Sequence, residues 1–313
     1  MTRSLAELRC SPNALAPHYM SFNVAGRLLL TGHSHQAWPD AGFAAQQEAW
    51  LDAARYVDDK WEHAFERVQR VQRGYAALLA DDDGDITLAS NTHELVVRFL
   101  SALPLRERPR LVTTDAEFHT IRRQLDRLGE ERLVEVVKVP GYPAAAAAES
   151  LASQVDDRTA AVLVSAVFFE RGVIVPGLGR LAAACAHHGA ALLVDAYHAL
   201  GAIPFPLKPL GLGGAFVVGG GYKYLQLGEG NCFLRTPPGC GLRPVVTGWF
   251  SEFAELAEAR VPGGIRYGTG PARFAGSTFD PTSAYRGAAV MEFFRDQGLT
   301  PEFLREVSQH QVG

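Results

Sequence analysis

Two charged side chains and one aromatic ring each follow a predicted strand, and their types suit covalent chemistry on a carbonyl compound. Lys223 comes after the apolar run from Ala215 to Val218 and three glycines, Asp195 directly follows the run from Ala191 to Val194, and Phe118 follows an earlier strand. A lysine held among apolar neighbours loses solvation of its ammonium, so its pKa falls and its amine becomes a nucleophile. A carboxylate after a buried strand must find a partner, because an unpaired buried charge is costly.

Each of these residues also has a simpler interpretation. Taken alone, Lys223 is typical of a surface lysine after a glycine turn, and Phe118 of a core ring. Asp195 could pair with an arginine, a helix terminus or the protonated ring nitrogen of a cofactor. Together they supply what a pyridoxal phosphate site needs: an amine for the Schiff base, a carboxylate that keeps the pyridine nitrogen protonated, and a flat stacking partner. The sequence therefore predicts pyridoxal 5'-phosphate as the cofactor and no metal.

The segment from Ser90 to Glu94 joins a predicted strand to a predicted helix. The amides of Thr92 and His93 could hold a phosphate there, since a helix N-terminus carries partial positive charge. Simple helix capping by Asn91 or Thr92 explains the same pattern. Both interpretations stay open at this point.

The elements that must position these residues alternate between strand and helix from Asp85 onward. Strands are expected at 85–90, 110–114, 133–139, 161–168, 191–194, 215–218 and 231–235, and helices at 93–103, 120–128, 144–155, 178–188 and 283–296. This order predicts an α/β fold with a mostly parallel sheet and helices on both faces. Ligands of such sheets bind at the carboxyl ends of the strands, which is where the candidate residues fall.

The first 80 residues differ in character. Residues 1–30 are expected to form an arm, because prolines interrupt any helix there. The loop from Thr31 to Pro39 carries two histidines without an acidic partner, which is a poor metal signal. A loop near a ligand is one interpretation, but the turn residues favour a solvated loop. From Asp40 to Leu79 the spacing of apolar and aromatic residues such as Trp50 predicts helix with those rings in the core.

The composition argues against several classes of protein. The 313 residues carry a net charge of −4 and no long basic run, so no nucleic acid or anionic membrane is expected as a partner. The four cysteines lie far apart, which indicates free thiols rather than a disulfide framework or a zinc knuckle. Because no apolar leader and no stretch of membrane-spanning length is present, a cytoplasmic location is expected.

Two motifs resemble those of a known superfamily. The segments from Leu193 to Gly201 and from Gly221 to Leu225 are similar to the class V aminotransferase superfamily of fold-type I pyridoxal phosphate enzymes. Within it, the tyrosines around Lys223 and the downstream segment from Thr247 to Phe250 look closest to kynureninase. The resemblance covers the chain from about Thr31 to Phe294.

The resemblance implies roles for particular residues. Lys223 would bind the cofactor covalently and later move protons, Asp195 would pair with the pyridine nitrogen with His198 close by, and Phe118 would stack on the ring. The residues implied for the phosphate are Thr92, His93 and Tyr222, and those implied for cofactor contacts, often from a neighbouring subunit, are Trp249 and Thr278. The resemblance thus implies a homodimer with shared active sites and an amino acid as the substrate.

The reaction implied by the kynureninase resemblance is hydrolysis of the β–γ carbon bond of kynurenine or 3-hydroxykynurenine to an anthranilate and alanine. Two alternatives stay open: another class V enzyme (an aminotransferase, cysteine desulfurase or lyase), or an inactive truncated cofactor-binding protein. The expected organisation is an N-terminal arm and helical segment over residues 1–80 and a cofactor-binding large domain over 81–282. Residues 283–313 would begin a C-terminal small domain, truncated according to the resemblance.

Overall fold

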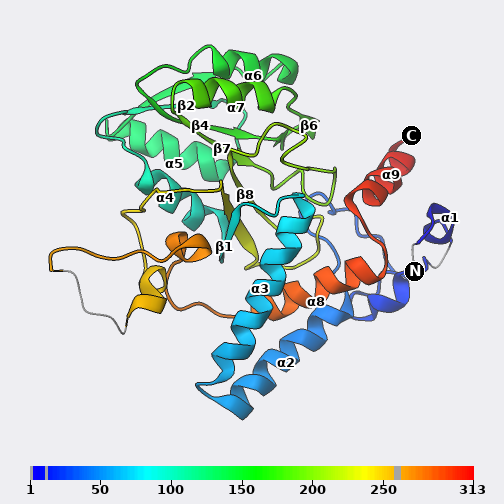
Figure 1. Ribbon diagram of the computed structural model, residues 1–313. Coiled ribbons are helices and arrows are strands. Elements are labelled where there is room, and N and C mark those ends of the chain that lie inside the picture. The colour runs from blue at the N-terminus through cyan, green and yellow to red at the C-terminus, as the bar shows by residue number, and fades with distance from the viewer. Residues whose placement is uncertain (1–2, 11–12, 257–261) are drawn as a thin grey trace.

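The computed structural model describes residues 3–10, 13–256 and 262–313. Within these residues a seven-stranded sheet has the order β1-β9-β8-β7-β4-β2-β3 (Figure 1). Its strands are β1 (Asp85–Ala89), β2 (Arg110–Thr114), β3 (Glu135–Val139), β4 (Thr159–Ser165), β7 (Ala191–Asp195), β8 (Phe216–Gly220) and β9 (Cys232–Thr236). A separate small sheet pairs β5 (Val167–Phe168) with β6 (Val173–Ile174), so the strand expected over 161–168 is interrupted after Ser165.

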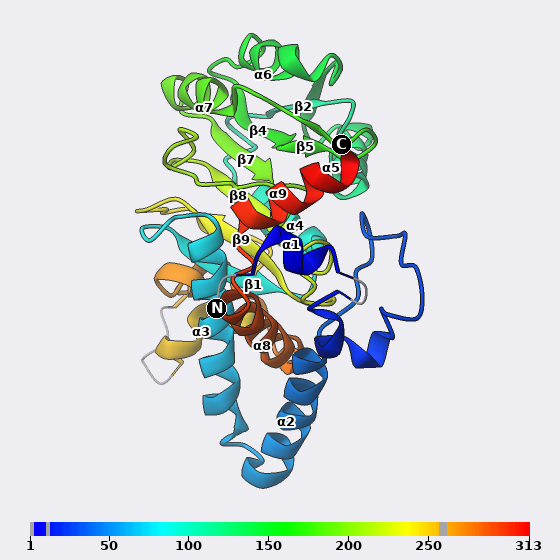
Figure 2. The same cartoon turned by 90° about the vertical axis from the view of Figure 1, so that its right-hand side faces the viewer.

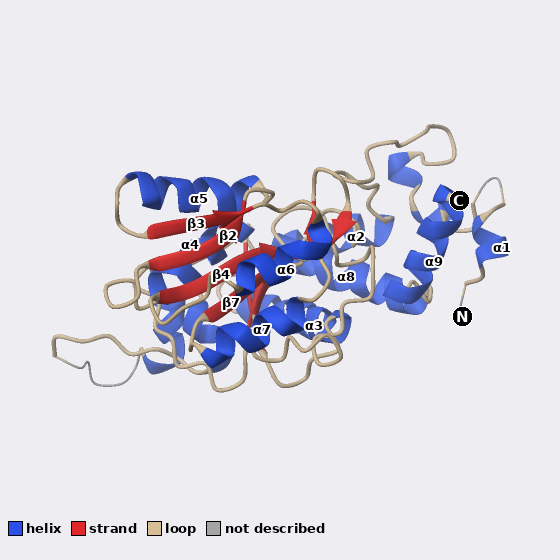
Figure 3. Ribbon diagram, turned by 90° about the horizontal axis from the view of Figure 1, so that it is seen from above, coloured by secondary structure: helices blue, strands red, loops and turns tan. Residues whose placement is uncertain are grey.

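Five neighbouring strands run parallel, from β8 through β7, β4 and β2 to β3, and Figure 3 shows β3, β2, β4 and β7 side by side. The predicted mostly parallel α/β fold is therefore confirmed. The exception is β9, which is antiparallel to both β8 and β1. Only residues 221–231 connect β8 to β9, which is shorter than the dozen or so residues that a parallel crossover requires.

Helices cover both faces of the sheet. They are α4 (Thr92–Ala102), α5 (His119–Glu130), α6 (Ala144–Ala152) and α7 (Leu178–His187). Residues of α4 and α5 pack in one buried cluster with Leu163 of β4, whereas residues of α6 and α7 pack in another with Val162 and Val164 of the same strand. This division follows from the two-residue period of a strand, which sends successive side chains to opposite faces.

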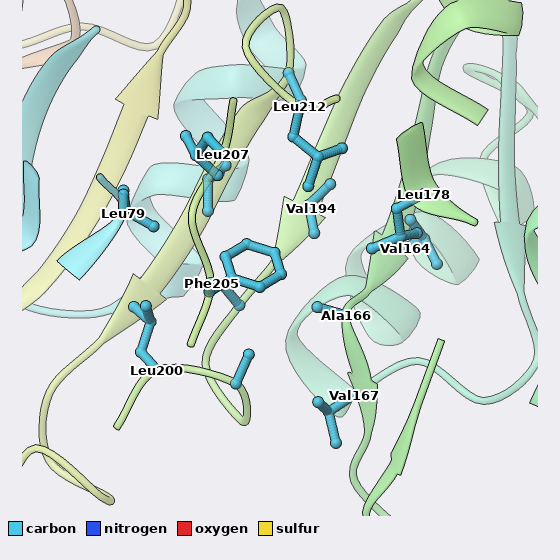
Figure 4. Packing of buried hydrophobic residues seen from close by; sticks show 14 of the residues in the cluster. Leu79, Val164, Ala166, Val167, Leu178, Val194, Leu200, Phe205, Leu207 and Leu212 are labelled. Atoms are coloured by element: carbon cyan, nitrogen blue, oxygen red, sulfur yellow. The ribbon is translucent and has the colours of Figure 1, made fainter. Parts of the chain in front are cut away.

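The second of these clusters also takes in the chain between β7 and β8. Figure 4 shows Phe205, Leu207 and Leu212 of this connection lying beside Val194 of β7. All four side chains are buried. The connection has no helix of its own, so these apolar contacts hold it on the sheet and bring the chain back to begin β8.

A helical unit stands below the sheet in Figure 1. It consists of α2 (Asp40–Tyr56), α3 (Lys60–Leu78) and α8 (Thr282–Asp296), and α8 lies along both other helices. The helix expected from Asp40 to Leu79 is therefore two helices, separated where Val57 adopts a φ of 51°. The placement of Trp50 in the core was wrong, because its side chain is 79% exposed. Spacing alone identifies an apolar stripe but not what covers it.

The shorter elements complete the chain. They are α1 (Leu5–Leu8), α9 (Pro301–Val312) and 3₁₀ helices at Ala16–His18, Met20–Phe22, Trp249–Glu255 and Gly270–Phe274. Between α1 and α2 the N-terminal arm loops beside the body of the molecule, drawn in blue in Figure 2. Across the described ranges, no helix is both long and apolar enough to cross a membrane.

Candidate active site

Lys223 lies in the turn that follows β8. Of the four lysines in the chain it is the buried one, with 6% of its surface exposed, whereas Lys138 and Lys208 form ion pairs at the surface. Its Nζ atom is 2.6 Å from Nε2 of His198. Burial lowers the pKa of Lys223, although the charge of Asp195 opposes that change. The amine is therefore deprotonated more readily than that of an exposed lysine, as a nucleophile requires.

Three aromatic rings surround the Lys223 amine. Its Nζ lies 5.3 Å from the ring centre of Phe118, 5.6 Å from that of Tyr197 and 5.7 Å from that of Tyr222. These distances lie within the range of cation–π attraction, which favours the protonated form. Phe118 and Tyr222 were both predicted at this site from the sequence, and the fold brings them together from different strand ends.

Asp195 ends β7 and is 6% exposed. Its Oδ1 accepts a hydrogen bond of 2.8 Å from the Tyr197 backbone amide. Burial raises the pKa of Asp195 to about 6, against the effects of that hydrogen bond and of the Lys223 charge. Among the described residues no arginine forms an ion pair with Asp195, so the arginine partner considered from the sequence is not what holds it.

His198 carries a neutral imidazole at the centre of this group. Burial is the main cause that lowers the pKa of His198 to about 4, and the charges of Lys223 and His33 contribute to this fall. The ring of His198 lies 5.9 Å from Phe118 and 6.2 Å from Phe169. A neutral imidazole beside an amine can accept the hydrogen bond of an ammonium and so hold the Lys223 side chain in one orientation.

The N-terminus of α4 reaches the same group of residues. Asn91 caps this helix by accepting a hydrogen bond of 2.9 Å from Glu94, which agrees with the capping interpretation. Burial raises the pKa of the Cys232 thiol and the Thr92 amide lowers it; the Cys232 sulfur lies 3.8 Å from the Tyr197 hydroxyl. Capping and anion binding are compatible, because the cap uses only one of the free amides of the first turn.

The remaining predicted residues are placed less centrally. His93 is exposed in the first turn of α4. Trp249 is half-exposed and packs on Phe250 and Phe253. Thr278 is exposed and lines a cavity of about 860 Å³ whose wall also includes Ser90 and Glu94 at the start of α4. Their roles toward the cofactor stay predictions.

Glu117 is a buried acid of this site that sequence reasoning missed. It precedes Phe118 and is 2% exposed, and its oxygens accept hydrogen bonds of 2.7 Å from Thr114 and 2.6 Å from Ser165. Burial raises the pKa of Glu117 to about 7, and the charge of Asp195 adds to the rise. These bonds tie the ends of β2 and β4 to the turn that carries Phe118. An acidic residue before an aromatic residue is a common pattern, so the sequence alone did not indicate that Glu117 is buried at this site.

The histidine loop, residues 31–36, is the second feature that the sequence did not place at the site. Its two histidines are exposed, as expected, but the ring of His35 lies 5.8 Å from that of Tyr222. The charge of His33 acts on His198. Of the two interpretations of this loop, the less favoured one, a place near a ligand, agrees with its contact with Tyr222.

The three glycines before Lys223 make room for the protein's own side chains. A Cβ atom on Gly219 would lie 2.9 Å from the ring of Phe233, and one on Gly220 would lie 2.6 Å from the ring of Tyr197. One on Gly221 would lie 2.3 Å from Leu227. The space beside these glycines is therefore filled by packed side chains of the protein itself.

The residues present suit a pyridoxal phosphate group. Lys223 supplies the amine, Asp195 a buried carboxylate without a cationic side chain bonded to it in the described structure, and Phe118 a ring beside the amine. The first turn of α4 supplies amides for an anion. This donor set combines an amine, an acceptor for a ring N–H, a flat face and an anion site, which are the features of that cofactor.

Comparisons with known proteins agree with the fold and the motifs. A family model described as aminotransferase class-V matches residues 53–226. A curated relative, the uncharacterized aminotransferase YcbU of Bacillus subtilis (strain 168), is 23% identical over 253 residues, which cover 80% of this chain and 65% of the relative. The chain thus spans less than two thirds of the length of that relative.

Several solved structures share the fold. A C-DES mutant with glycine covalently linked to its pyridoxal phosphate cofactor has a TM-score of 0.76 at 17% identity and covers 93% of this chain and 76% of its own. The cysteine desulfurase of Thermococcus onnurineus NA1 has a TM-score of 0.72 at 17% identity, with coverages of 96% and 73%. Escherichia coli CsdA has a TM-score of 0.73 at 16% identity, with coverages of 93% and 73%. None of these comparisons supports the narrower resemblance to kynureninase.

Proposed function

The chain belongs to the class V aminotransferase family, and on that premise we propose that it uses pyridoxal 5'-phosphate to remove the α-proton of an amino acid substrate. The observation that carries the proposal is the buried Lys223 amine, 2.6 Å from His198 and beside the buried Asp195. When bound, pyridoxal phosphate supplies an electron sink for the α-carbon. The protein supplies the amine that accepts the proton and holds this amine in orientation.

Each residue of the site has a defined task in this proposal. Lys223 holds the cofactor and takes the α-proton on Nζ, for which its lowered pKa is suited. His198, neutral because of its lowered pKa, accepts a hydrogen bond from Nζ and orients it. Asp195 accepts the ring N–H of the cofactor, and this partner stabilises a carboxylate that burial alone disfavours. Phe118, whose ring lies beside the Lys223 amine, would contact the cofactor ring.

The fate of the substrate after proton removal separates the possible reactions. The similar structures include cysteine desulfurases and a cystine C–S lyase. Cys232, the thiol beside Tyr197, is buried, and burial raises the pKa of its thiol to about 12. Such a thiol stays protonated and is a poor sulfur acceptor. This favours an aminotransferase or a lyase over a desulfurase that would use Cys232.

A kynureninase-like hydrolase is the second candidate, and one observation favours it. The ring of Phe169 stands edge-on to Phe118 at 5.2 Å and lies 5.5 Å from His119. An aromatic wall of this kind suits an amino acid with a flat side chain, because offset and edge-on ring contacts are favourable. Kynurenine and 3-hydroxykynurenine have such side chains.

Lys223→Ala tests the proposed site. Wild-type protein reconstituted with pyridoxal phosphate and treated with borohydride is expected to carry the cofactor mass on the Lys223 peptide. The alanine variant should lose that label and about 10²–10⁴-fold in activity, the usual contribution of a proton-transferring group. Lys208→Ala is the matched control, because Lys208 pairs with Asp83 at the surface. A label on Lys60, Lys138 or Lys208 instead would refute the assignment.

Exchange in heavy water then identifies the substrate class. Loss of the α-proton signal from a panel of amino acids, followed by NMR, reports proton removal whichever product forms. Persulfide from cystine, or sulfide from cysteine, would indicate a lyase. Transfer of the amino group to an added keto acid would indicate an aminotransferase, and fluorescent anthranilate from kynurenine would indicate the hydrolase. Cofactor binding without α-proton exchange by any amino acid of the panel would contradict the proposed reaction.

A homodimer and a cytoplasmic location remain proposals. Large apolar side chains are exposed on the arm and on α2, namely Leu28 at 86%, Leu30 at 82% and Trp50 at 79%. Exposed apolar side chains mark an interaction surface where they form a contiguous patch. A second copy of the chain is the partner that the resemblance implies, and Trp249 and Thr278 would then act across the interface.

A further inference from the structure

Glu117 is a buried acid of the site to which the proposed function gives no task. It is 2% exposed, and its two side-chain oxygens lie 2.7 Å from the Thr114 hydroxyl and 2.6 Å from the Ser165 hydroxyl. Thr114 ends β2 and Ser165 ends β4, and these two strands are neighbours in the sheet. A single side chain therefore joins two strands at their carboxyl ends, where the candidate site lies.

Both strand ends lead into a segment that carries an aromatic ring of the site. Phe118 follows Glu117 directly and is the residue before α5. Ser165 is followed by the short strand β5, and Phe169 is the first residue after that strand. The two rings meet edge-on with centres 5.2 Å apart, and Nζ of Lys223 lies 5.3 Å from the Phe118 ring centre. The hydrogen bonds of Glu117 thus connect the backbone segments that support both rings.

The end of β4 is also joined to Asp195. Ser165 lies opposite Asp195 in the pairing of β4 with β7, and the amide of Ala166 donates to the carbonyl of Asp195 over 2.8 Å. Glu117 is therefore connected through Ser165 to the residue that is proposed to hold the ring N–H of the cofactor. Two like charges in one buried site disfavour each other, so one of the two carboxyls is expected to stay neutral.

The contacts of Glu117 favour its neutral form. Both hydrogen-bond partners are uncharged hydroxyls, and in the described ranges no lysine, arginine or histidine forms an ion pair with Glu117. A buried carboxylate without a cation is costly, and burial raises the pKa of Glu117 to about 7. A hydroxyl can accept as well as donate a hydrogen bond, so the acid proton can be shared with Thr114 or with Ser165.

We propose that Glu117 is a positioning residue, which holds Phe118 and Phe169 in place for the bound cofactor and its substrate. It does so as a neutral carboxylic acid, through its bonds to the two hydroxyls. Its neutrality leaves Asp195 to carry the negative charge beside the ring nitrogen of the cofactor. This inference rests on the proposed function, because it takes Lys223 as the attachment point of the cofactor.

Infrared spectroscopy measures the protonation state of Glu117 without any turnover. A protonated carboxyl has a C=O stretching band above the amide bands, and this band moves in heavy water. Holoenzyme is compared with Glu117→Gln holoenzyme at about pH 6, below the pKa of about 7. The difference spectrum should contain the band, because an amide side chain cannot produce it. A difference spectrum with carboxylate bands alone would overturn the neutral acid.

Titration of cofactor-free protein with pyridoxal phosphate, followed by fluorescence, tests the positioning. Glu117→Gln keeps an acceptor and adds a donor, so its dissociation constant should stay within about twofold of wild type. Glu117→Leu keeps the volume but loses both bonds, and its dissociation constant should rise about tenfold. Thr114→Val and Ser165→Ala each remove one bond and should lie between these two. Glu149→Leu is the matched control, because Glu149 is exposed on α6.

A double-mutant cycle with Phe118→Leu separates positioning from a general loss of stability. If Glu117 acts through Phe118, Glu117→Leu should weaken cofactor binding much less once the Phe118 ring is already absent. The visible circular dichroism of the bound cofactor reports its fixed orientation, and it should fall in both single leucine variants and recover in Glu117→Gln. Additive effects on the dissociation constant would give Glu117 a purely structural role and overturn the proposal.

The remaining outcomes separate this inference from the proposed function. A Glu117→Gln variant that binds cofactor as weakly as Glu117→Leu would show that the charged form is required, against the proposal. If Glu117→Leu does not fold, Thr114→Val and Ser165→Ala carry the test, and unchanged cofactor affinity in both would overturn the positioning while leaving Lys223 chemistry intact. Wild-type protein that binds no pyridoxal phosphate at Lys223 would refute the proposed function itself.

Discussion

Burial sets the chemistry of single residues at this site. Lys223 and Asp195 are both almost fully buried, and burial disfavours the charged form of each, so the pKa of the amine falls and that of the carboxyl rises. Lys223 contacts the neutral His198 and Asp195 accepts one backbone hydrogen bond, and a bound cofactor would provide each with a further partner. Residues that cost stability in the empty protein and are stabilised by a ligand are typical of functional sites.

Asp195→Asn tests this cost through the pH dependence of stability. The folded-state pKa of Asp195 is raised from 3.8 to about 6, so its contribution to stability is full below about pH 4 and is lost as the pH rises to about 6. The ionised carboxylate then costs about 3 kcal/mol. Without cofactor, the Asn variant should therefore be more stable than wild type at neutral pH, and this advantage should disappear near pH 4.

Urea unfolding of the cofactor-free proteins across that pH range measures the difference. Glu117 is present in both proteins, and its pKa is raised mainly by burial, so only the smaller part of that rise caused by the Asp195 charge differs between them. With pyridoxal phosphate added, the order should reverse, because the Asn variant loses the partner of the ring nitrogen. A difference that does not vary with pH would show that Asp195 is not a destabilised carboxylate.

At the scale of elements, β8 and the turn after it determine where Lys223 lies. The strand packs so closely against its neighbours that side chains at its last positions are excluded. The antiparallel strand β9 returns beside it, and Tyr197, which follows β7, fills the remaining space. The glycines are therefore part of the packing that aims the lysine.

Gly220→Ala should disturb this packing. The added methyl group would lie 2.6 Å from Tyr197 and 2.7 Å from the Cys232 sulfur, so these groups must move. We expect a loss of about 1–3 kcal/mol in the free energy of unfolding, the usual cost of overpacking, and a weaker affinity for pyridoxal phosphate. Gly214→Ala, at a position with open space around it, is the control. Equal stability of the two variants would mean that the strand tolerates a side chain there.

A buried ion pair joins the end of α3, in the helical unit, to strand β9 of the sheet. Arg235 of β9 donates to Asp81, just after α3, over 2.7 Å, and both side chains are at most 1% exposed. Arg235 also donates to the carbonyls of Gly213 and Ala215. These contacts connect the end of α3, the start of β8 and β9.

Arg235→Met should destabilise the protein by about 3–5 kcal/mol, because Asp81 would remain as a buried charge without its partner. Asp81→Leu combined with Arg235→Met removes both charges and should recover much of this loss. Chemical denaturation of the single and double variants measures the effect. If the loss of stability in the double variant equals the sum of the losses in the two single variants, the two charges do not stabilise each other.

At the scale of the whole molecule, the arm and α2 carry the apolar surface that we assign to a second copy. Sedimentation is expected to give a dimer, and Trp50→Glu to shift it toward monomer, because a charge would be buried at the interface. Gln47→Glu places the same charge on the same helix and serves as the control. A wild-type monomer at micromolar concentration would contradict the dimer.

The whole molecule also joins segments that are far apart in sequence. Residues 40–78 were expected in an N-terminal segment and the helix near residue 283 at the start of a C-terminal small domain, yet α8 packs along α2 and α3. Helix periodicity identified each helix separately, but it carries no information on which apolar stripes face each other. The same limit explains the misplaced Trp50, whose spacing fits a stripe that the described structure leaves exposed.

The sequence by itself determined the alternation of strands and helices, the mostly parallel sheet, and the group of Lys223, Asp195 and Phe118. These follow from local patterns, since strand period and turn residues mark where each strand ends and parallel strands end at one edge. Only the tertiary structure decided the environment of that group. Glu117 lies at this group because β2 and β4 are neighbours. His35 lies near it because the arm folds back to Tyr222, although more than 180 residues separate the two in the sequence. Burial and long-range contact set these properties, and neither is encoded in the spacing of residues along the chain.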